Sequence, residues 1–410
     1  MAPALPMLSG LRIIEGSAFV AAPLGGLTLA QLGAEVIRVD PLSGGLDFNR
    51  WPLAKSQASL FWAGLNRSKK SIQVDLKNEK GRELIADLIT VPGEGAGIFL
   101  TNLSSKDQLS YEELRKKRAD VIMISVTGNF DGSSEVDYTV HPAFGYPVIT
   151  GPRNSIYPTN SVLPTWDLIL GNLVAIAILA AERKRRLTGE GEFVSIALSD
   201  VALSVVGALG RLSQAYIGEE KIEADGNYLY GSFGKNFLTA DNKQIMLVGL
   251  TSRQWNSLKL ALDVEDPLKE LETIASADFQ NEGQRYLHRE AIAQIIAKAV
   301  ASKNLADLIP AFLTHKVSWS KYQSFEELLK YDQRASKQNP IFSLQNQPGI
   351  GIIPNIASPI RFKFGGNLEP GTAPNFGEHT EEILKQILNL TPEELNKLIV
   401  EKIIKRDNGR

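Results

Sequence analysis

Asp167 is the carboxylate in this chain whose position best suits covalent chemistry. It follows Leu163-Pro-Thr-Trp166 and stands at the start of a long apolar helix predicted over residues 168–186. An acid at a helix start often only stabilises the helix, as a cap worth about 0.5–2 kcal/mol. A carboxylate held there by backbone amides can also act as a nucleophile, because carboxylates form covalent acyl and phosphoryl intermediates. Position alone leaves both interpretations open.

Several cations could meet phosphate groups, namely Arg38, Arg50, Arg67, Lys69 and Lys70. Residues 67–70 come just before a predicted strand, so their cations gather at one edge of the sheet, where arginine and lysine can contact phosphates. A solvated turn would have the same composition. The residues themselves do not separate these two interpretations.

Common nucleotide-binding motifs are absent from the sequence. The segment after the first predicted strand, Gly16-Ser-Ala-Phe-Val-Ala-Ala-Pro23, lacks the G-x-G-x-x-G of a dinucleotide site, although Asp40 stands where a ribose-binding acid would be. Gly231-Ser-Phe-Gly-Lys235 lacks the spacing of a P-loop. With no cysteine and four scattered histidines, the sequence predicts no metal centre. We also expect no tightly bound cofactor.

Composition and charge exclude nucleic acid as the main partner. Lysine and arginine together number 44 and the acids number 46, for a net charge of −2, whereas phosphate neutralisation needs a basic surface. The apolar stretches 16–34 and 168–181 are interrupted or too short for a bilayer span of about 20 residues, and no signal peptide is predicted. We expect a cytoplasmic protein that does not bind membranes.

The first 130 residues alternate between strand-like and helix-like segments, and residues 168–216 add two helices with a strand between them. The predicted strands are 11–15, 35–40, 70–76, 96–101, 121–127 and 194–198, and the predicted helices are 23–32, 80–90, 111–118, 168–186 and 201–216. This alternation is typical of a doubly wound α/β fold, with a mainly parallel sheet and helices on both faces.

The pattern changes after about residue 220, where residues 227–249 predict a loop with a hairpin. Residues 252–330 predict mostly amphipathic helix, and the chain closes with helices at 380–388 and from Thr391. We therefore predict a large α/β domain over 1–200, a linker over 201–225, a smaller, mostly helical α+β domain over 226–330, and a return to the large domain over 331–410.

Several segments, in order along nearly the whole chain, resemble the class III CoA-transferases. They are Arg12-Ile-Ile-Glu-Gly-Ser17 with Ala30-Gln-Leu-Gly-Ala-Glu-Val-Ile-Arg38, Asn66-Arg-Ser-Lys-Lys-Ser-Ile-Gln-Val-Asp75, Trp166-Asp-Leu-Ile-Leu-Gly171, Leu187-Thr-Gly-Glu-Gly191 with Asp200, and Gly377-Glu-His-Thr380. The resemblance implies a Rossmann-like large domain, an acyl-CoA thioester substrate that brings coenzyme A with it, and an interlaced homodimer. It also implies that Asp167 is the nucleophile.

Contacts with CoA follow from the same resemblance. The family's positions fall on Phe19, Val20, Ala21, Lys69, Lys70 and Asn102, and Arg38 is added for a CoA phosphate because of its charge and position. Val20 departs from the family pattern, since formyl-CoA transferase has a glutamine there. No side-chain role is therefore carried over to Val20.

One branch of the family moves CoA between the two carboxyl groups of a single C5 dicarboxylic acid, in a route of carbon fixation through 3-hydroxypropionate. This chain resembles that branch at 15–26, 44–52, 134–140 and 226–231. The resemblance implies transfer between the C1 and C4 carboxyls of mesaconate, through an aspartyl anhydride and an aspartyl-CoA thioester. Such a reaction needs a cation for the free carboxylate, for which we choose Arg50. It also needs oxyanion donors, for which the amides of Gly231 and Gly234 are candidates.

Three alternatives remain open at this point. An intermolecular transferase would pass CoA to a separate acid, and a non-catalytic acyl-CoA-binding protein would keep the fold without needing Asp167. A racemase would need bases on both sides of the substrate's α-carbon. The family's histidine position reads as serine in Gly132-Ser-Ser-Glu-Val-Asp-Tyr138, and its glutamate position falls near Val248-Gly-Leu-Thr251. Only His141 is left as a shifted substitute.

Overall fold

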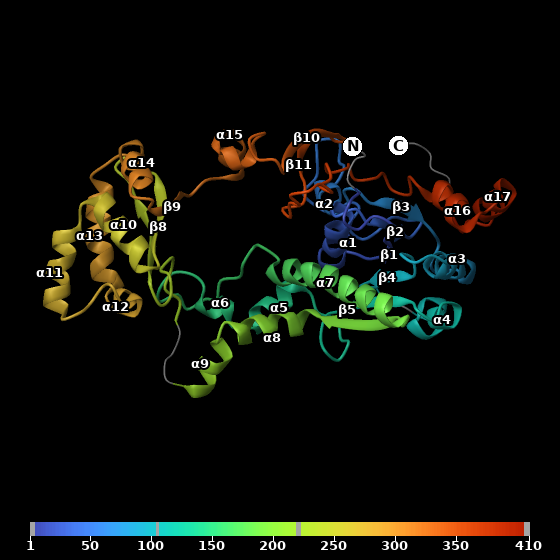
Figure 1. Cartoon of the computed structure of the whole chain (residues 1–410), viewed down its shortest axis with the longest axis horizontal. Coiled ribbons are helices and arrows are strands. Elements are labelled where there is room, and N and C mark those ends of the chain that lie inside the picture. The colour runs from blue at the N-terminus through green and yellow to red at the C-terminus, as the bar shows by residue number, and fades with distance from the viewer. Residues whose placement is uncertain (1–4, 104–105, 219–222, 406–410) are drawn as a thin grey trace. The chain divides into compact units, whose positions relative to one another are not determined.

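The computed structural model describes residues 5–103, 106–218 and 223–405 and divides the chain into two compact units (Figure 1). The first unit consists of Met1–Phe144, Ser161–Glu220 and Gln333–Arg410, and the second consists of Gly145–Asn160 and Lys221–Asp332. Each unit has its own hydrophobic core. The chain therefore enters the second unit twice, and the short first visit at Gly145–Asn160 was not predicted.

A six-stranded sheet forms the centre of the first unit. Its strands are β1 (Arg12–Gly16), β2 (Glu35–Asp40), β3 (Lys70–Gln73), β4 (Ile98–Thr101), β5 (Ile122–Thr127) and β6 (Glu192–Ala197). Every neighbouring pair is parallel, and the strand order is β3-β2-β1-β4-β5-β6. This confirms the predicted Rossmann-like α/β fold with its mainly parallel sheet. The order reverses between β1 and β4, which leaves a crevice at the carboxyl ends of these two strands.

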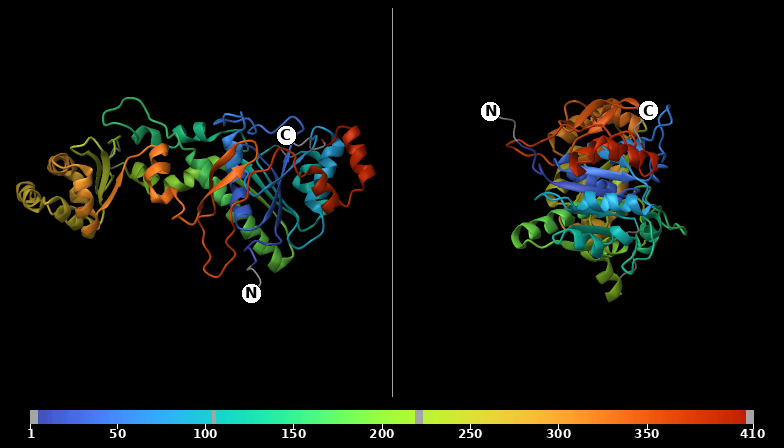
Figure 2. Two further views of the ribbon diagram at one scale, coloured as in Figure 1. Left: turned by 90° about the horizontal axis from the view of Figure 1, so that it is seen from above. Right: turned by 90° about the vertical axis from the view of Figure 1, so that its right-hand side faces the viewer.

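Helices cover both faces of this sheet (Figure 2). Because side chains alternate along a strand, one face packs Ile14, Ile37, Phe99 and Met123 into a core shared with α3 (Glu79–Thr90), α4 (Tyr111–Lys117), α16 (Thr380–Leu388) and α17 (Pro392–Val400). The opposite face lies under α1 (Ala21–Gln31), which packs along α7 (Thr165–Thr188). Among the described residues, α7 alone has the length and the mean hydropathy, 1.5, of a membrane span. Its packing against α1, β5 and β6 accounts for that composition.

The remaining elements of the first unit include features that the sequence did not predict. They are α2 (Leu60–Leu65), α5 (Asp137–Ala143) and an antiparallel hairpin of β10 (Phe342–Gln347) and β11 (Gly351–Ile356). The single helix predicted over 201–216 is wrong, because α8 (Leu198–Ala208) and α9 (Arg211–Ile217) are separate helices. Gly210 breaks the chain between them by adopting a left-handed conformation with φ 74°.

The second unit combines a small antiparallel sheet with a helical core. Its sheet consists, in order, of β7 (Phe233–Leu238), β8 (Gln244–Gly249) and β9 (Ser318–Lys321), and β7 and β8 form the hairpin predicted within 227–249. Around Trp255 and Phe279, which are fully buried, the helices form one hydrophobic cluster with this sheet. The elements are α6 (Tyr146–Ile149), β7 (Phe233–Leu238), β8 (Gln244–Gly249), α10 (Ser252–Leu262), α11 (Glu265–Ala275), α12 (Glu282–Leu287), α13 (Arg289–Ala301), α14 (Leu305–Thr314), β9 (Ser318–Lys321) and α15 (Phe325–Tyr331).

The contact between α1 and α7 depends on a glycine in α7. A Cβ atom added to Gly171 would lie 2.8 Å from the carbonyl oxygen of Ala21 and 2.8 Å from Cβ of Leu24. Neither backbone nor Cβ can move aside without separating the helices. This close approach fixes the position of α7, and with it the start of the helix where Asp167 stands.

We predict that Gly171→Ala destabilises the protein by about 1–3 kcal/mol, because an added methyl overpacks the α1–α7 contact. Gly64→Ala in α2 is the matched control. Its Cβ would meet no atom within 4 Å, so it should be neutral or stabilise by about 0.5–1 kcal/mol. Thermal unfolding followed by circular dichroism measures both, and equal midpoints for the two variants would contradict the prediction.

Candidate active site

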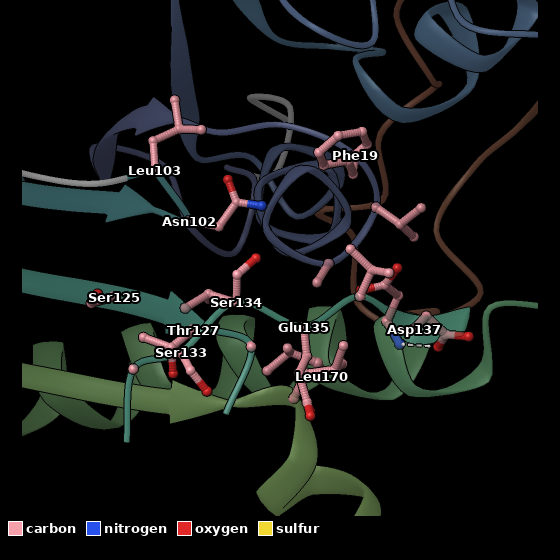
Figure 3. A pocket seen from close by; sticks show the side chains of 18 of the residues that line it. Phe19, Asn102, Leu103, Ser125, Thr127, Ser133, Ser134, Glu135, Asp137 and Leu170 are labelled. Atoms are coloured by element: carbon pink, nitrogen blue, oxygen red, sulfur yellow. Dashed lines mark hydrogen bonds between the residues drawn. The ribbon is translucent and has the colours of Figure 1, made fainter. Parts of the chain in front are cut away.

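A cavity of about 1000 Å³ opens in the first unit at the carboxyl ends of β1, β4 and β5 (Figure 3). Phe19 follows β1, Asn102 follows β4 and Thr127 ends β5, and all three line the cavity. The cavity therefore occupies the crevice where the strand order reverses, which is the usual ligand site of open α/β sheets. Val20, Ala21, Arg50 and Asp167 also line it.

Asn102 ties together the loops that follow β1 and β4. Its side-chain oxygen accepts a hydrogen bond of 2.9 Å from the amide of Ala18, and its side-chain nitrogen donates one of 2.7 Å to the carbonyl of Ala18. The next residue, Phe19, has a left-handed backbone with φ 67°, which is uncommon for a residue with a large side chain. The Asn102 side chain thus fixes the loop that presents Phe19 to the cavity.

Asp137 caps the helix that carries Asp167. Its carboxylate accepts hydrogen bonds from the amides of Trp166, at 2.7 Å, and Asp167, at 3.0 Å. Pro164, at the N-cap position of α7, supplies no side-chain acceptor, so the acceptor comes from α5 instead. We expected the amides at this helix start to hold Asp167 in its ionised form. The structure corrects that expectation, because Asp137 occupies two of those amides.

The Asp167 carboxyl is correspondingly hard to ionise. Its pKa is raised to about 7, chiefly by burial and further by the nearby Asp137 carboxylate, while Arg50 acts in the opposite direction. The protonated form of Asp167 is therefore favoured more than that of an exposed aspartate. Perturbed carboxyls of this kind are concentrated in functional sites.

Of the described residues that line the cavity, Arg50 alone is cationic. In the described part of the chain, no carboxylate lies within ion-pair distance of its guanidinium, although four acids line the same cavity: Glu112, Glu135, Asp137 and Asp167. Arg50 Cζ instead lies 5.3 Å from the centre of the Phe19 ring and 5.1 Å from that of Phe61. Its charge is thus available to an anionic ligand.

Arg38 and Lys69 lie inside the protein and do not line the cavity. Arg38 is paired with Asp40 at 3.0 Å and Asp47 at 2.8 Å, and Lys69 is paired with Glu15 at 2.9 Å. At most 1% of either cationic side chain is exposed. Neither residue lines the cavity, and the predicted contacts of Arg38 and Lys69 with CoA stay predictions. Buried cations need such partners, because an unpaired buried charge is strongly destabilising.

Lys70, Gly231 and Gly234 also lie outside the set of residues that line the cavity. Lys70 forms ion pairs with Glu35 at 3.1 Å and Glu382 at 3.2 Å. Gly231 and Gly234 belong to the second unit, so their proposed oxyanion role stays a prediction.

Two residues of the site, Asp137 and Phe61, were missed by the sequence analysis. Pro164 was the available signal for Asp137, because a helix with proline at its N-cap must find its capping acceptor elsewhere in the chain. For Phe61 no signal was present, since a phenylalanine in a short apolar segment resembles any core residue. His141 is buried, and its Nε2 atom accepts from the amide of Ser161 at 3.3 Å. It does not line the cavity, so it offers no racemase base there.

Comparison with known proteins identifies the family to which this fold and site belong. The sequence model of CoA-transferase family III matches residues 8–380. The chain therefore belongs to CoA-transferase family III. A solved structure of a CAIB/BAIF family protein from Brucella suis superposes with a TM-score of 0.76 at 22% identity, covering 94% of this chain and 100% of that one.

Curated relatives place the chain more narrowly within the family. It is 46% identical to the 2-methylfumaryl-CoA isomerase of Chloroflexus aurantiacus, over 97% of this chain and 98% of that protein. It is 27% identical to a succinate–glutarate CoA-transferase of Agrobacterium fabrum, over 93% of this chain and 96% of that protein.

The electrostatics of Asp167 predict a pH dependence. If ionised Asp167 is required, kcat/KM should fall as the pH drops through about 7. Asp137→Asn removes a neighbouring negative charge and should move this acid limb to lower pH. Arg50→Met removes the positive charge and should move it to higher pH. Profiles of kcat/KM from pH 5 to 9 test this, and shifts of both variants in the same direction would contradict the assignment.

Proposed function

We propose that this protein transfers CoA between the C1 and C4 carboxyl groups of mesaconate, which interconverts 2-methylfumaryl-CoA and 3-methylfumaryl-CoA. The observation that carries the proposal is the presence, in one cavity, of a carboxyl with a perturbed pKa and of a cation with which no described carboxylate forms an ion pair. The first suits an acyl-accepting nucleophile, and the second suits the free carboxylate of a dicarboxylic acid. The named activity of the 46% identical relative supports the same reaction.

Asp167 begins the proposed route as nucleophile. Its carboxylate oxygen attacks the thioester carbonyl, the C–S bond breaks, and an acyl–aspartyl anhydride forms as CoA leaves as a thiolate. The thiolate then attacks the aspartyl carbonyl and expels the mesaconate carboxylate, which leaves Asp167 as a CoA thioester. The other mesaconate carboxylate attacks this thioester to form the second anhydride and release the thiolate. Attack of the thiolate on the mesaconyl carbonyl completes the transfer and restores Asp167.

Arg50 holds the free carboxylate of the acid in this proposal. A dicarboxylate that must return its other end to the same nucleophile has to stay bound while it turns. Arginine is suited to that task, because its planar guanidinium binds a carboxylate through two parallel hydrogen bonds. Intramolecular transfer therefore requires Arg50 to be positioned before the first anhydride forms.

CoA itself enters as part of the substrate. We propose that the loop formed by Phe19, Val20 and Ala21, fixed by Asn102, makes the wall along which the thioester approaches. Arg38 and Lys69 act through the buried ion pairs that hold the neighbouring loops. A role for Lys70 at the CoA phosphates, the interlaced homodimer, and a cytoplasmic location without nucleic-acid or membrane partners stay predictions.

An intermolecular transferase is the second candidate, favoured by the likeness to the succinate–glutarate enzyme. The two functions differ in whether a separate acid is needed. The purified protein should be incubated with mesaconyl-C1-CoA and labelled free mesaconate, with products separated by chromatography and mass spectrometry. Formation of the C4 isomer without label would support intramolecular transfer. Turnover only with an added acceptor, or full label equilibration, would favour the alternative.

We predict that Asp167→Asn abolishes transfer without lowering stability. The folded carboxyl binds its proton more tightly than the unfolded one, because its pKa is raised from 3.8 to about 7. Ionised Asp167 therefore destabilises the fold increasingly between about pH 4 and 7, and the cost is fully present above pH 7. Relative to wild type, the thermal midpoint of Asp167→Asn should be higher, and more so at pH 8 than at pH 5. Near-normal turnover would remove the nucleophile assignment, and a pH-independent difference would contradict the electrostatic argument.

A further inference from the structure

The Arg50 side chain contacts two aromatic rings that also line the cavity. Its Cζ atom lies 5.3 Å from the centre of the Phe19 ring and 5.1 Å from that of Phe61. A guanidinium this close to a ring face is attracted by the ring's quadrupole. Ring contacts also leave the N–H groups at the edge of the guanidinium free to donate to a ligand. We call Phe19 and Phe61 the aromatic pair.

Hydrogen bonds fix the backbone segments that carry the aromatic pair. The backbone of Ala18, next to Phe19, is fixed by its two hydrogen bonds with Asn102. Phe61 lies on α2, whose N-cap residue Ser59 accepts a hydrogen bond of 3.0 Å from the amide of Trp62. The Ser59 hydroxyl also donates to the carbonyl of Arg50 at 2.5 Å. The start of α2 and the backbone of Arg50 are thereby joined.

A free arginine side chain would sample many rotamers, and a carboxylate bound to it would move with it. The aromatic pair reduces this freedom without neutralising the charge. In the described residues that line the cavity, acids outnumber Arg50, yet none forms an ion pair with it. The arrangement thus keeps the cation in the cavity and unoccupied, which is what retention of a dicarboxylate requires.

We propose that Phe19 and Phe61 are positioning residues for Arg50, and that by fixing its guanidinium they retain the free carboxylate of the bound acid and make the transfer intramolecular. This inference rests on the proposed function. The inference explains why transfer is intramolecular by the immobility of Arg50. An intermolecular transferase must instead let each bound acid leave. A more mobile Arg50 side chain should therefore allow the bound acid to exchange with free acid, while Asp167 still forms its acyl intermediates.

The test compares label exchange per turnover. Wild type, Phe19→Leu, Phe61→Leu and Arg50→Met are each given mesaconyl-C1-CoA and labelled free mesaconate. Label in the CoA esters is measured at equal conversion. Loss of one cation–π contact should raise label incorporation per turnover about 3- to 30-fold in either leucine variant, and Arg50→Met should raise it at least as much. Because the aromatic pair acts through Arg50, Phe61→Leu should add nothing in the Arg50→Met background.

Phe364→Leu is the matched control, since it removes a ring from another cation–π contact, that with Lys363, at residues that do not line the cavity. It should behave as wild type. Thermal midpoints show which variants fold. If Phe19→Leu does not fold, Phe61→Leu alone tests the inference. Wild-type retention in both leucine variants, or a full multiplicative effect of Phe61→Leu on Arg50→Met, would overturn the inference. Wild type that does not convert the substrate without an acceptor would overturn the proposed function instead, and the inference with it.

Discussion

Two carboxylates at the start of α7 set the electrostatics of the whole cavity. The helix needs an acceptor for its first amides, and Asp137 supplies it from α5 with hydrogen bonds to Trp166 and Asp167. A capping carboxylate is stabilised by the positive end of the helix dipole. Burial raises the pKa of the Asp167 carboxyl most, and the negative charge of Asp137 beside it raises that pKa further. One contact thus fixes the position of the proposed nucleophile and opposes its ionisation, and Arg50 provides the compensating charge.

The opposite wall of the cavity depends on a buried network of charges. Arg38 donates to the carbonyl of Ser17 at 2.9 Å and to Asp47 at 2.8 Å, so it joins the loop before Phe19 to the loop before Arg50. Removing one partner of such a pair costs about 3–5 kcal/mol, because the other charge stays buried without compensation. The network therefore positions both the Phe19 ring and the Arg50 guanidinium, which meet in the cavity. Its contribution to function is indirect and conformational.

The sequence predicted the parallel sheet well because most of its strands contain a short apolar run between turn residues. The range 35–40 coincides with β2, and the range 380–388 coincides with α16. The network was not predictable, because a sequence shows that Arg38 is charged but not that Asp40 and Asp47 face it in the interior. The role of Asp137 likewise arises from a contact between segments about 30 residues apart. Asp167 itself was found because position and family resemblance agree on it, whereas the break at Gly210 depends on a left-handed turn that the apolar pattern of 201–216 conceals.

The same electrostatics favour the covalent states of the proposed route. In the free enzyme an ionised Asp167 lies near Asp137, and binding a dicarboxylate adds a further negative charge to the cavity. Both the anhydride and the CoA thioester convert Asp167 into a neutral acyl group, and its negative charge passes to the CoA thiolate in the first case and to the second carboxylate of the acid in the other. The burial that makes the carboxyl hard to ionise then no longer opposes the intermediate, because a neutral group has little to lose on desolvation. Arg50 meanwhile keeps a carboxylate partner in the acid whenever Asp167 is acylated. The charge arrangement at the start of α7 therefore favours movement of negative charge from Asp167 to the leaving group, which suits repeated acyl exchange at a single residue in the proposed route.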